Sequence, residues 1–152
     1  MKRKPYHPVP ALTRAEETAI LAPPVAFDEK DGFDDIQEIR NGLPVETFFQ
    51  LQEKLGVGTA QLAEVVDIPV RTLRRRKDEG RLTKEESDRL DRVRNLLNRA
   101  TDVFDSETSA RAWLTRPQTG LAGFVPLELA DTGAGIREVE NLLGRIDYGV
   151  CA

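Results

Sequence analysis

Cysteine and histidine are almost absent from this chain of 152 residues, which holds one of each, Cys151 and His7. A single cysteine excludes an internal disulfide, and the pair provides too few ligands for a structural zinc site. His7 lies among prolines near the start of the chain, where no helix or strand pattern surrounds it. We therefore expect no metal, no cofactor and no catalytic residue.

Long apolar runs and phosphate-binding loops are also missing. No run approaches the roughly 20 apolar residues that a membrane span needs, and the basic start MKRKPYHPVP has no apolar signal core behind it. A cytoplasmic protein without a membrane partner is expected. The sequence has no GxxxxGK loop, and its GLAG and GAG segments lack a surrounding βαβ unit. An enzyme is therefore the least favoured class.

Positive charge is concentrated in the middle of an acidic chain, whose formal net charge is −4. Residues 58–99 hold 11 basic and 8 acidic side chains, net +3, between a start (1–57) of net −3 and an end (100–152) of net −4. Within RTLRRRKDEG, residues 71–77 carry five basic side chains and no acidic one. This partition predicts a central module that binds a polyanion such as DNA.

Apolar spacing predicts an all-α fold in three parts. Residues 1–41 form a partly ordered arm, with a short helix at 11–22 and a Gly/Pro-broken acidic linker after it. Residues 42–104 form the DNA-binding part, and residues 105–152 a small helical domain. Local signals include a capping box from Thr83 and Glu86, an N-cap at Thr59, salt bridges within the long helix (Glu85–Arg89 and Asp88–Arg92), a left-handed turn at Asp67, buried Leu121 and Phe124, and a loose helix start at Gly133 and Gly135.

Two short helices on either side of Asp67, the second of them basic, have the pattern of a helix-turn-helix. Leu62, Val66, Ile68 and Leu73 would form their shared core. The second helix would then place its N-terminal residues on base edges in the major groove. A merely solvated charged face is the competing interpretation. The candidate DNA-binding residues are Arg71, Thr72, Arg74 and Arg75 on the second helix, with Thr59 and Gln61 holding phosphates from the first.

The longest helix pattern carries the apolar stripe Leu90, Val93, Leu97, Ala100 and Phe104. The stripe either packs inside its own domain or is shared between two subunits, and the sequence favours neither. Helix-turn-helix proteins usually bind two half-sites. A homodimer is therefore expected.

The C-terminal block GLAGFVPLELADTGAGIREVENLLGRIDYGV resembles the toxin-binding domain of Xre/MbcA/ParS-type antitoxins. The similar features are a glycine turn, Pro-Leu-x-Leu at 126–129, Thr-Gly at 132–133, a Val-x-x-Leu-Leu helix, and Tyr-Gly at 148–149. The resemblance implies an antitoxin that covers the active site of a RES-domain toxin, typically an NAD-consuming enzyme, and binds operator DNA to repress its own operon.

The candidate toxin-binding residues combine apolar side chains, an acidic one and the Tyr-Gly end: Leu127, Glu128, Val139, Leu143, Ile146, Tyr148 and Gly149. For the apolar members, a plain core role is the competing interpretation. The alternative function is a helix-turn-helix transcriptional regulator whose C-terminal domain senses a small molecule or a protein. Co-purification with a neighbouring gene's product distinguishes the two.

Overall fold

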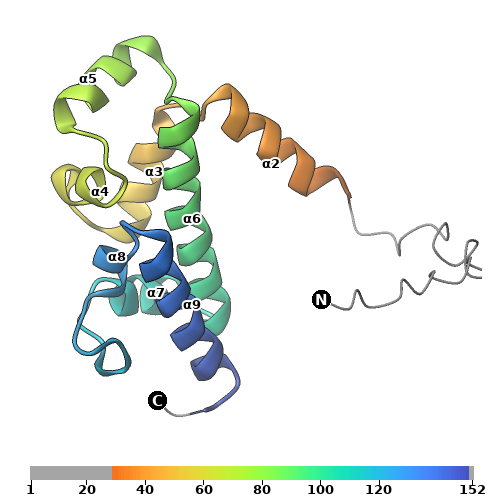
Figure 1. Ribbon diagram of the computed structural model, residues 1–152, viewed down its shortest axis with the longest axis vertical. Helices are drawn as coiled ribbons and strands as arrows, with labels where there is room; N and C mark the ends of the chain where they lie inside the picture. The colour runs from red at the N-terminus through yellow and green to blue at the C-terminus, as the bar shows by residue number, and fades with distance from the viewer. Residues whose placement is uncertain (1–28, 151–152) are drawn as a thin grey trace, which may run out of the picture. The chain divides into compact units, whose positions relative to one another are not determined.

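A computed structural model describes residues 29–150, and within that range it contains helices and no β-strand (Figure 1). This confirms the all-α prediction. The helix expected at 11–22, His7 and Cys151 lie outside the described residues. The helical elements are α2 (Glu29–Asn41), α3 (Glu46–Leu55), α4 (Thr59–Val65), α5 (Val70–Glu79), α6 (Lys84–Phe104), α7 (Glu107–Leu114), the 3₁₀ turn η1 (Thr119–Leu121), α8 (Pro126–Leu129) and α9 (Gly133–Asp147).

The prediction of an acidic linker up to residue 35 is wrong in its second half, because residues from Glu29 onward form α2. The chain from Asp34 onward is one compact unit with a single core, so the boundary predicted at 104/105 falls inside it. That boundary stays a prediction.

The long helix α6 connects the two ends of this unit (Figure 1). It packs against α3, α7 and α9. Leu90, Val93, Leu97 and Ala100 are all buried inside the same chain. The apolar stripe is therefore core, and it no longer supports a contact between subunits.

The α4–α5 pair packs as the sequence predicts. Its four shared-core residues are buried, and Asp67 takes the left-handed conformation with φ 51°. Arg89 of α6 holds this turn in place, because its Nε donates a hydrogen bond to the Val66 carbonyl oxygen at 2.7 Å. The predicted Glu85–Arg89 pair is therefore wrong, since Arg89 binds the turn instead. The Asp88–Arg92 pair is confirmed.

Arg76 and Glu86 join the second helix of the motif to the start of α6. The Arg76 guanidinium donates two hydrogen bonds to Glu86, at 2.8 and 3.1 Å, and Glu86 also completes the predicted capping box with Thr83. Glu86 is only 7% exposed. Burial by itself would raise the pKa of Glu86, but the hydrogen bonds from Arg76 and Thr83 outweigh it and hold this pKa below its ordinary value. One of the five basic residues is thus structural.

Replacing Glu86 by glutamine should lower the free energy of unfolding at neutral pH by about 2 kcal/mol, because it leaves Arg76 without its main charge partner. The folded-state pKa of Glu86 is depressed. Its contribution is therefore complete above the unfolded pKa and is lost as pH falls through the folded value. Urea unfolding of wild type and variant should accordingly converge in acid. The exposed neighbour Glu85→Gln is the control; an equal loss in that variant would contradict the assignment.

Gly135 makes the start of α9 tight, where the sequence predicted a loose turn. A Cβ atom there would lie 1.8 Å from the Leu129 carbonyl oxygen, and the Gly135 N–H donates to the Thr132 side chain at 3.0 Å. Only glycine permits this close approach of backbone to α8. This close approach of the Gly135 backbone to Leu129 holds α8 against α9.

Two glycines of α9 should therefore respond oppositely to alanine. Gly135→Ala should destabilise the fold by about 2 kcal/mol through overpacking. Gly144→Ala should stabilise it by about 0.5–1 kcal/mol, since nothing lies within 4 Å of the added Cβ and alanine favours a helix. Thermal melts of both variants measure the difference. A Gly135→Ala protein as stable as wild type would show that α8 and α9 are not in this close contact.

Candidate functional site

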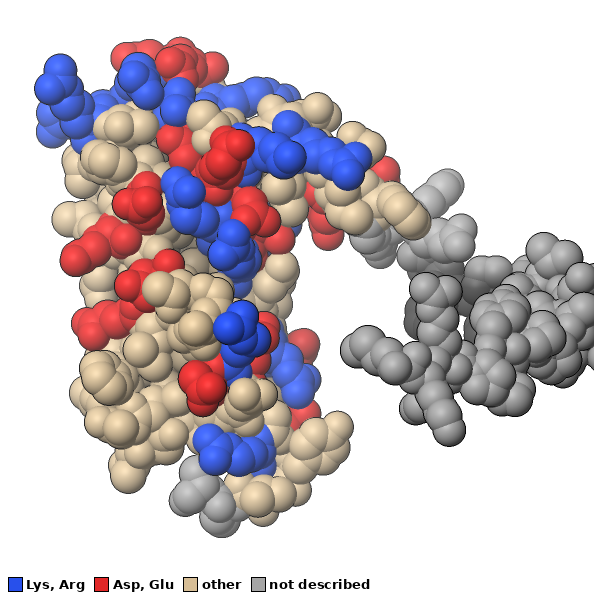
Figure 2. Space-filling view, viewed as in Figure 1, with Lys and Arg blue, Asp and Glu red and all other residues tan. Residues whose placement is uncertain are grey.

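Basic side chains gather over α5, at one end of the compact unit (Figure 2). Arg71, Arg74, Arg75 and Lys77 are exposed, whereas Thr72 is half-buried. Arg75 lies 3.6 Å from Glu79, a weak exposed pair. Arg71 and Arg74 form no ion pair with any carboxylate in the part of the chain that the structure describes. These two guanidinium groups are therefore the most available to an anionic ligand.

A hollow of about 320 Å³ lies beside this basic helix. Its lining combines cations with apolar and hydroxyl groups from α3, α4 and α5: Phe49, Thr59, Val70, Leu73, Arg74 and Lys77. The Lys77 ammonium lies 5.4 Å from the Phe49 ring centre, within cation–π range. The first helix of the motif and the second thus share one surface.

The sequence predicted Thr59 as the N-cap of α4, but in the structure Gly58 occupies the N-cap position. Thr59 is instead the first helical residue, and its hydroxyl donates to Gln52 Oε1 at 3.0 Å. Its backbone stays at the start of α4, beside the hollow that Arg74 and Lys77 line. Thr59 therefore remains a candidate phosphate contact.

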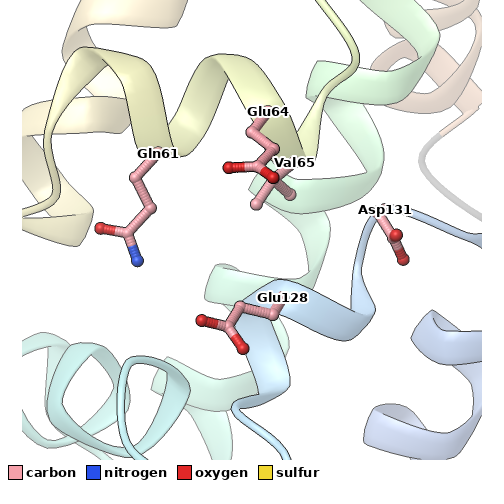
Figure 3. A pocket seen from close by; sticks show the side chains of 5 residues that line it. All are labelled: Gln61, Glu64, Val65, Glu128 and Asp131. Carbon is pink, nitrogen blue, oxygen red and sulfur yellow. The ribbon is translucent and has the colours of Figure 1, made fainter.

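Gln61 lies in different surroundings (Figure 3). It lines a second hollow, of about 300 Å³, between α4 and α8, where the other lining residues are Glu64, Val65, Glu128 and Asp131. A phosphate would meet three carboxylates there and would be repelled. We therefore omit Gln61 from the DNA surface proposed below. Glu128, one of the candidate toxin-binding residues, is exposed but faces this hollow.

The C-terminal candidates separate into buried and exposed groups. Leu127, Val139 and Leu143 are fully buried in the core. Direct contact of these three with a partner is incompatible with the structure, because their side chains fill the space between α8, α9 and the rest of the fold. Helical spacing alone could not show this, since a stripe that packs inward and one that meets a partner look the same in sequence.

Exposed apolar groups lie instead at the end of α9. Tyr148 is 84% exposed and Val150 57% exposed, and Gly149 between them has φ 68°. Ile146 is half-buried against the core, and Asp147 pairs with Arg99 of α6 at 3.0 Å. Beyond Asp147 the backbone folds back and caps α9, since the Val150 N–H donates to the Arg145 carbonyl at 2.8 Å, while the side chains of Tyr148 and Val150 stay exposed.

Phe124, which the sequence predicted to be buried, is 58% exposed. It follows η1, which packs against α9. The η1 loop and the last turn of α9 both lie at the end of the unit opposite α5 (Figure 1). The surface at that end is largely uncharged in the view of Figure 2. Large apolar side chains left in water at one end of a domain indicate a binding surface.

Within residues 29–150, no group of three or more His, Cys, Asp or Glu side chains could hold a metal ion. No helix in this range is long and apolar enough to cross a membrane.

Comparisons with known proteins identify both parts of this arrangement. Residues 34–95 match a family model described as the antitoxin Xre-like helix-turn-helix domain, and residues 99–149 match the antitoxin Xre/MbcA/ParS C-terminal toxin-binding domain. A protein of Yersinia enterocolitica named Antitoxin Xre is 31% identical over 147 residues, which cover 95% of this chain and 97% of that protein. The chain belongs to the Xre antitoxin family.

Two further relatives bear the same name. Antitoxin Xre of Photorhabdus laumondii is 32% identical over 114 residues, covering 74% of this chain and 77% of that protein. Antitoxin Xre of Pseudomonas putida is 36% identical over 83 residues, covering 54% and 52%. In this Xre antitoxin, α4 and α5 belong to the helix-turn-helix domain, and α8 and α9 to the toxin-binding domain.

Sequence reasoning missed three exposed residues on these surfaces, Val70, Lys77 and Phe124. Lys77 was part of the basic run, and its position beside Phe49 depends on how α3 packs on α5. Phe124 is predicted to be buried and Val70 belongs to no predicted site, because no local pattern distinguishes an apolar residue left in solvent from one in the core.

Proposed function

We propose that this chain is the antitoxin of a type II toxin–antitoxin system that inhibits a RES-domain toxin and binds operator DNA to repress its own operon. The observation that carries the proposal is the separation of two unlike surfaces: an arginine-rich one on α5 and an apolar one around Tyr148 at the opposite end. Each lies in the domain that the corresponding ligand requires. Both proposed functions are binding functions, and neither requires a catalytic residue on this chain.

Tyr148, Val150 and Phe124 form the proposed toxin-binding surface, with Gly149 allowing the chain to turn between the first two. An exposed aromatic ring with a polar tip is an efficient anchor in a partner's pocket. The three buried leucine and valine candidates act through packing, since they hold α8 and α9 in place. We propose that this surface covers the entrance to the active site of an enzyme that consumes NAD.

Arg71 and Arg74 are the proposed base contacts in the operator, and Thr59, Arg75 and Lys77 the proposed phosphate contacts. Arginine forks onto guanine in the major groove, whereas scattered cations and helix N-termini position the backbone. Two half-sites require two copies of the motif, so operator binding implies a homodimer. The described residues suggest no particular subunit contact.

The deciding experiment is co-expression with the neighbouring gene, followed by pulldown and measurement of cellular NAD. We expect a stable complex, and we expect NAD to fall with the neighbour alone and to recover when both are expressed. A chain that captures no protein and instead changes its DNA affinity with a metabolite would support the alternative, a regulator that senses a small molecule. NAD that stays unchanged while growth is arrested would contradict only the chemistry proposed for the toxin.

A further inference from the structure

Val70 is an apolar residue left exposed on a helix whose other outward residues are almost all charged. It is the first residue of α5 and is 39% exposed. The core of the motif is complete without it, since Leu73 one turn later packs inward together with Leu62, Val66 and Ile68. Its side chain is therefore available to a ligand.

The surroundings of Val70 place it on the surface proposed to bind DNA. It lines the hollow of ≈ 320 Å³ together with Thr59 and Arg74. It also borders a neighbouring hollow of ≈ 280 Å³, where the carboxylates of Glu64 and Asp67 mark the acidic edge of this surface. Residues 70, 74 and 77 lie three or four apart, so they share one face of α5. An apolar group thus stands between the start of α4 and the two cations Arg74 and Lys77.

DNA offers one apolar group in the major groove, the 5-methyl group of thymine, and small apolar side chains recognise thymine through it. The N-terminal residues of the second helix are the ones that reach base edges in this motif. Val70 carries two methyl groups and no hydrogen-bonding side-chain atom, so it would contact that methyl group and could not select another base.

We propose that Val70 selects a thymine in each operator half-site by contact with its 5-methyl group. The inference rests on the proposed operator binding and adds to it a base-selecting residue. Arg74, one turn further along the same face, contacts the same stretch of DNA. Arginines on α5 then supply affinity and guanine recognition, while Val70 supplies a preference that is independent of salt.

Replacing thymine by deoxyuridine tests this, because the exchange removes the methyl group and leaves base pairing unchanged. The probe is duplex DNA from upstream of the chain's own gene, with each thymine replaced singly and affinity measured by fluorescence anisotropy. With the wild-type chain, deoxyuridine at one position of a half-site should weaken binding about fourfold, which corresponds to about 0.8 kcal/mol, the contribution of one buried methyl-sized group.

Val70→Ser, which has no methyl group, should bind the thymine probe about as weakly as wild type binds the deoxyuridine probe, and it should not distinguish the two bases. Val103→Ser is the matched control: it is the same substitution at a half-buried valine of α6, outside both proposed binding surfaces, and it should keep the full discrimination. Melting temperatures confirm that each variant is folded.

Two outcomes overturn the proposal in different ways. Wild-type binding that is indifferent to deoxyuridine at every position, or equal discrimination by Val70→Ser, contradicts the role of Val70 and leaves operator binding intact. Absence of wild-type binding to the probe contradicts operator binding itself, and the inference about Val70 with it.

Discussion

Deletion of residues 148–152 is expected to abolish protection from the toxin while leaving the core intact. It removes only the backbone hydrogen bonds with which residues 148–150 cap α9. The structure sets the cut at Tyr148: α9 ends at Asp147, whose ion pair with Arg99 and whose neighbour Ile146 anchor the last turn. An earlier cut would remove core contacts as well. We expect the affinity for the toxin to fall about 1000-fold, or about 4 kcal/mol, since a few central anchors carry most of the energy of such an interface.

Single substitutions show which residues carry the affinity for the toxin. Tyr148→Ala should reproduce most of it, and Tyr148→Phe should show how much depends on the hydroxyl group. Phe124→Ala should add a smaller effect, because its ring lies on the neighbouring loop of the same end. Growth on co-expression with the toxin, at equal antitoxin level, is the readout. Full protection by the deletion variant would place the neutralising surface elsewhere on the chain.

The double variant Arg71→Ala/Arg74→Ala is expected to lose operator binding by about 1000-fold, because each guanidinium that forks onto a base contributes about 1–3 kcal/mol. The structure chooses this pair over Arg71 and Arg75, since Arg75 already lies near Glu79 and Arg76 is engaged with Glu86. Toxin neutralisation should be unaffected, as the two surfaces lie at opposite ends of the unit. Gel shifts at several salt concentrations measure both affinity and the number of ionic contacts.

Arg137→Ala/Arg145→Ala is the control, because it changes the net charge equally but on the exposed side of α9. If it weakens operator binding as much as the α5 double variant does, the effect is one of overall charge and α5 is not the recognition helix. If the α5 variant binds the operator normally, the basic run is only a solvated helix face.

Local chemistry in the sequence was enough for several helix ends and turns, although it missed the start of α2 and the N-cap of α4. Thr83 with Glu86 and the turn at Asp67 act through neighbouring backbone groups, so spacing along the chain identified them and the structure confirms them. The basic run on α5 and the end motif with Tyr148 were likewise readable, and they led to the two ligands that are now proposed.

Tertiary structure alone decided which side of each helix is free. Leu143 and Ile146 lie three residues apart on the apolar face of α9, but Leu143 is fully buried and Ile146 only half-buried, because the packing of α9 on α6 and α8 covers one more than the other. Arg76 and Arg74 are two residues apart in one basic run, and only the approach of Glu86 from the next helix makes Arg76 structural. In the sequence, Phe124 and Val70 do not differ from apolar core residues, and only the fold shows that they are exposed to solvent. A sequence determines what each side chain is able to contact, whereas long-range packing determines which contacts are already satisfied within the chain and which are left for a partner.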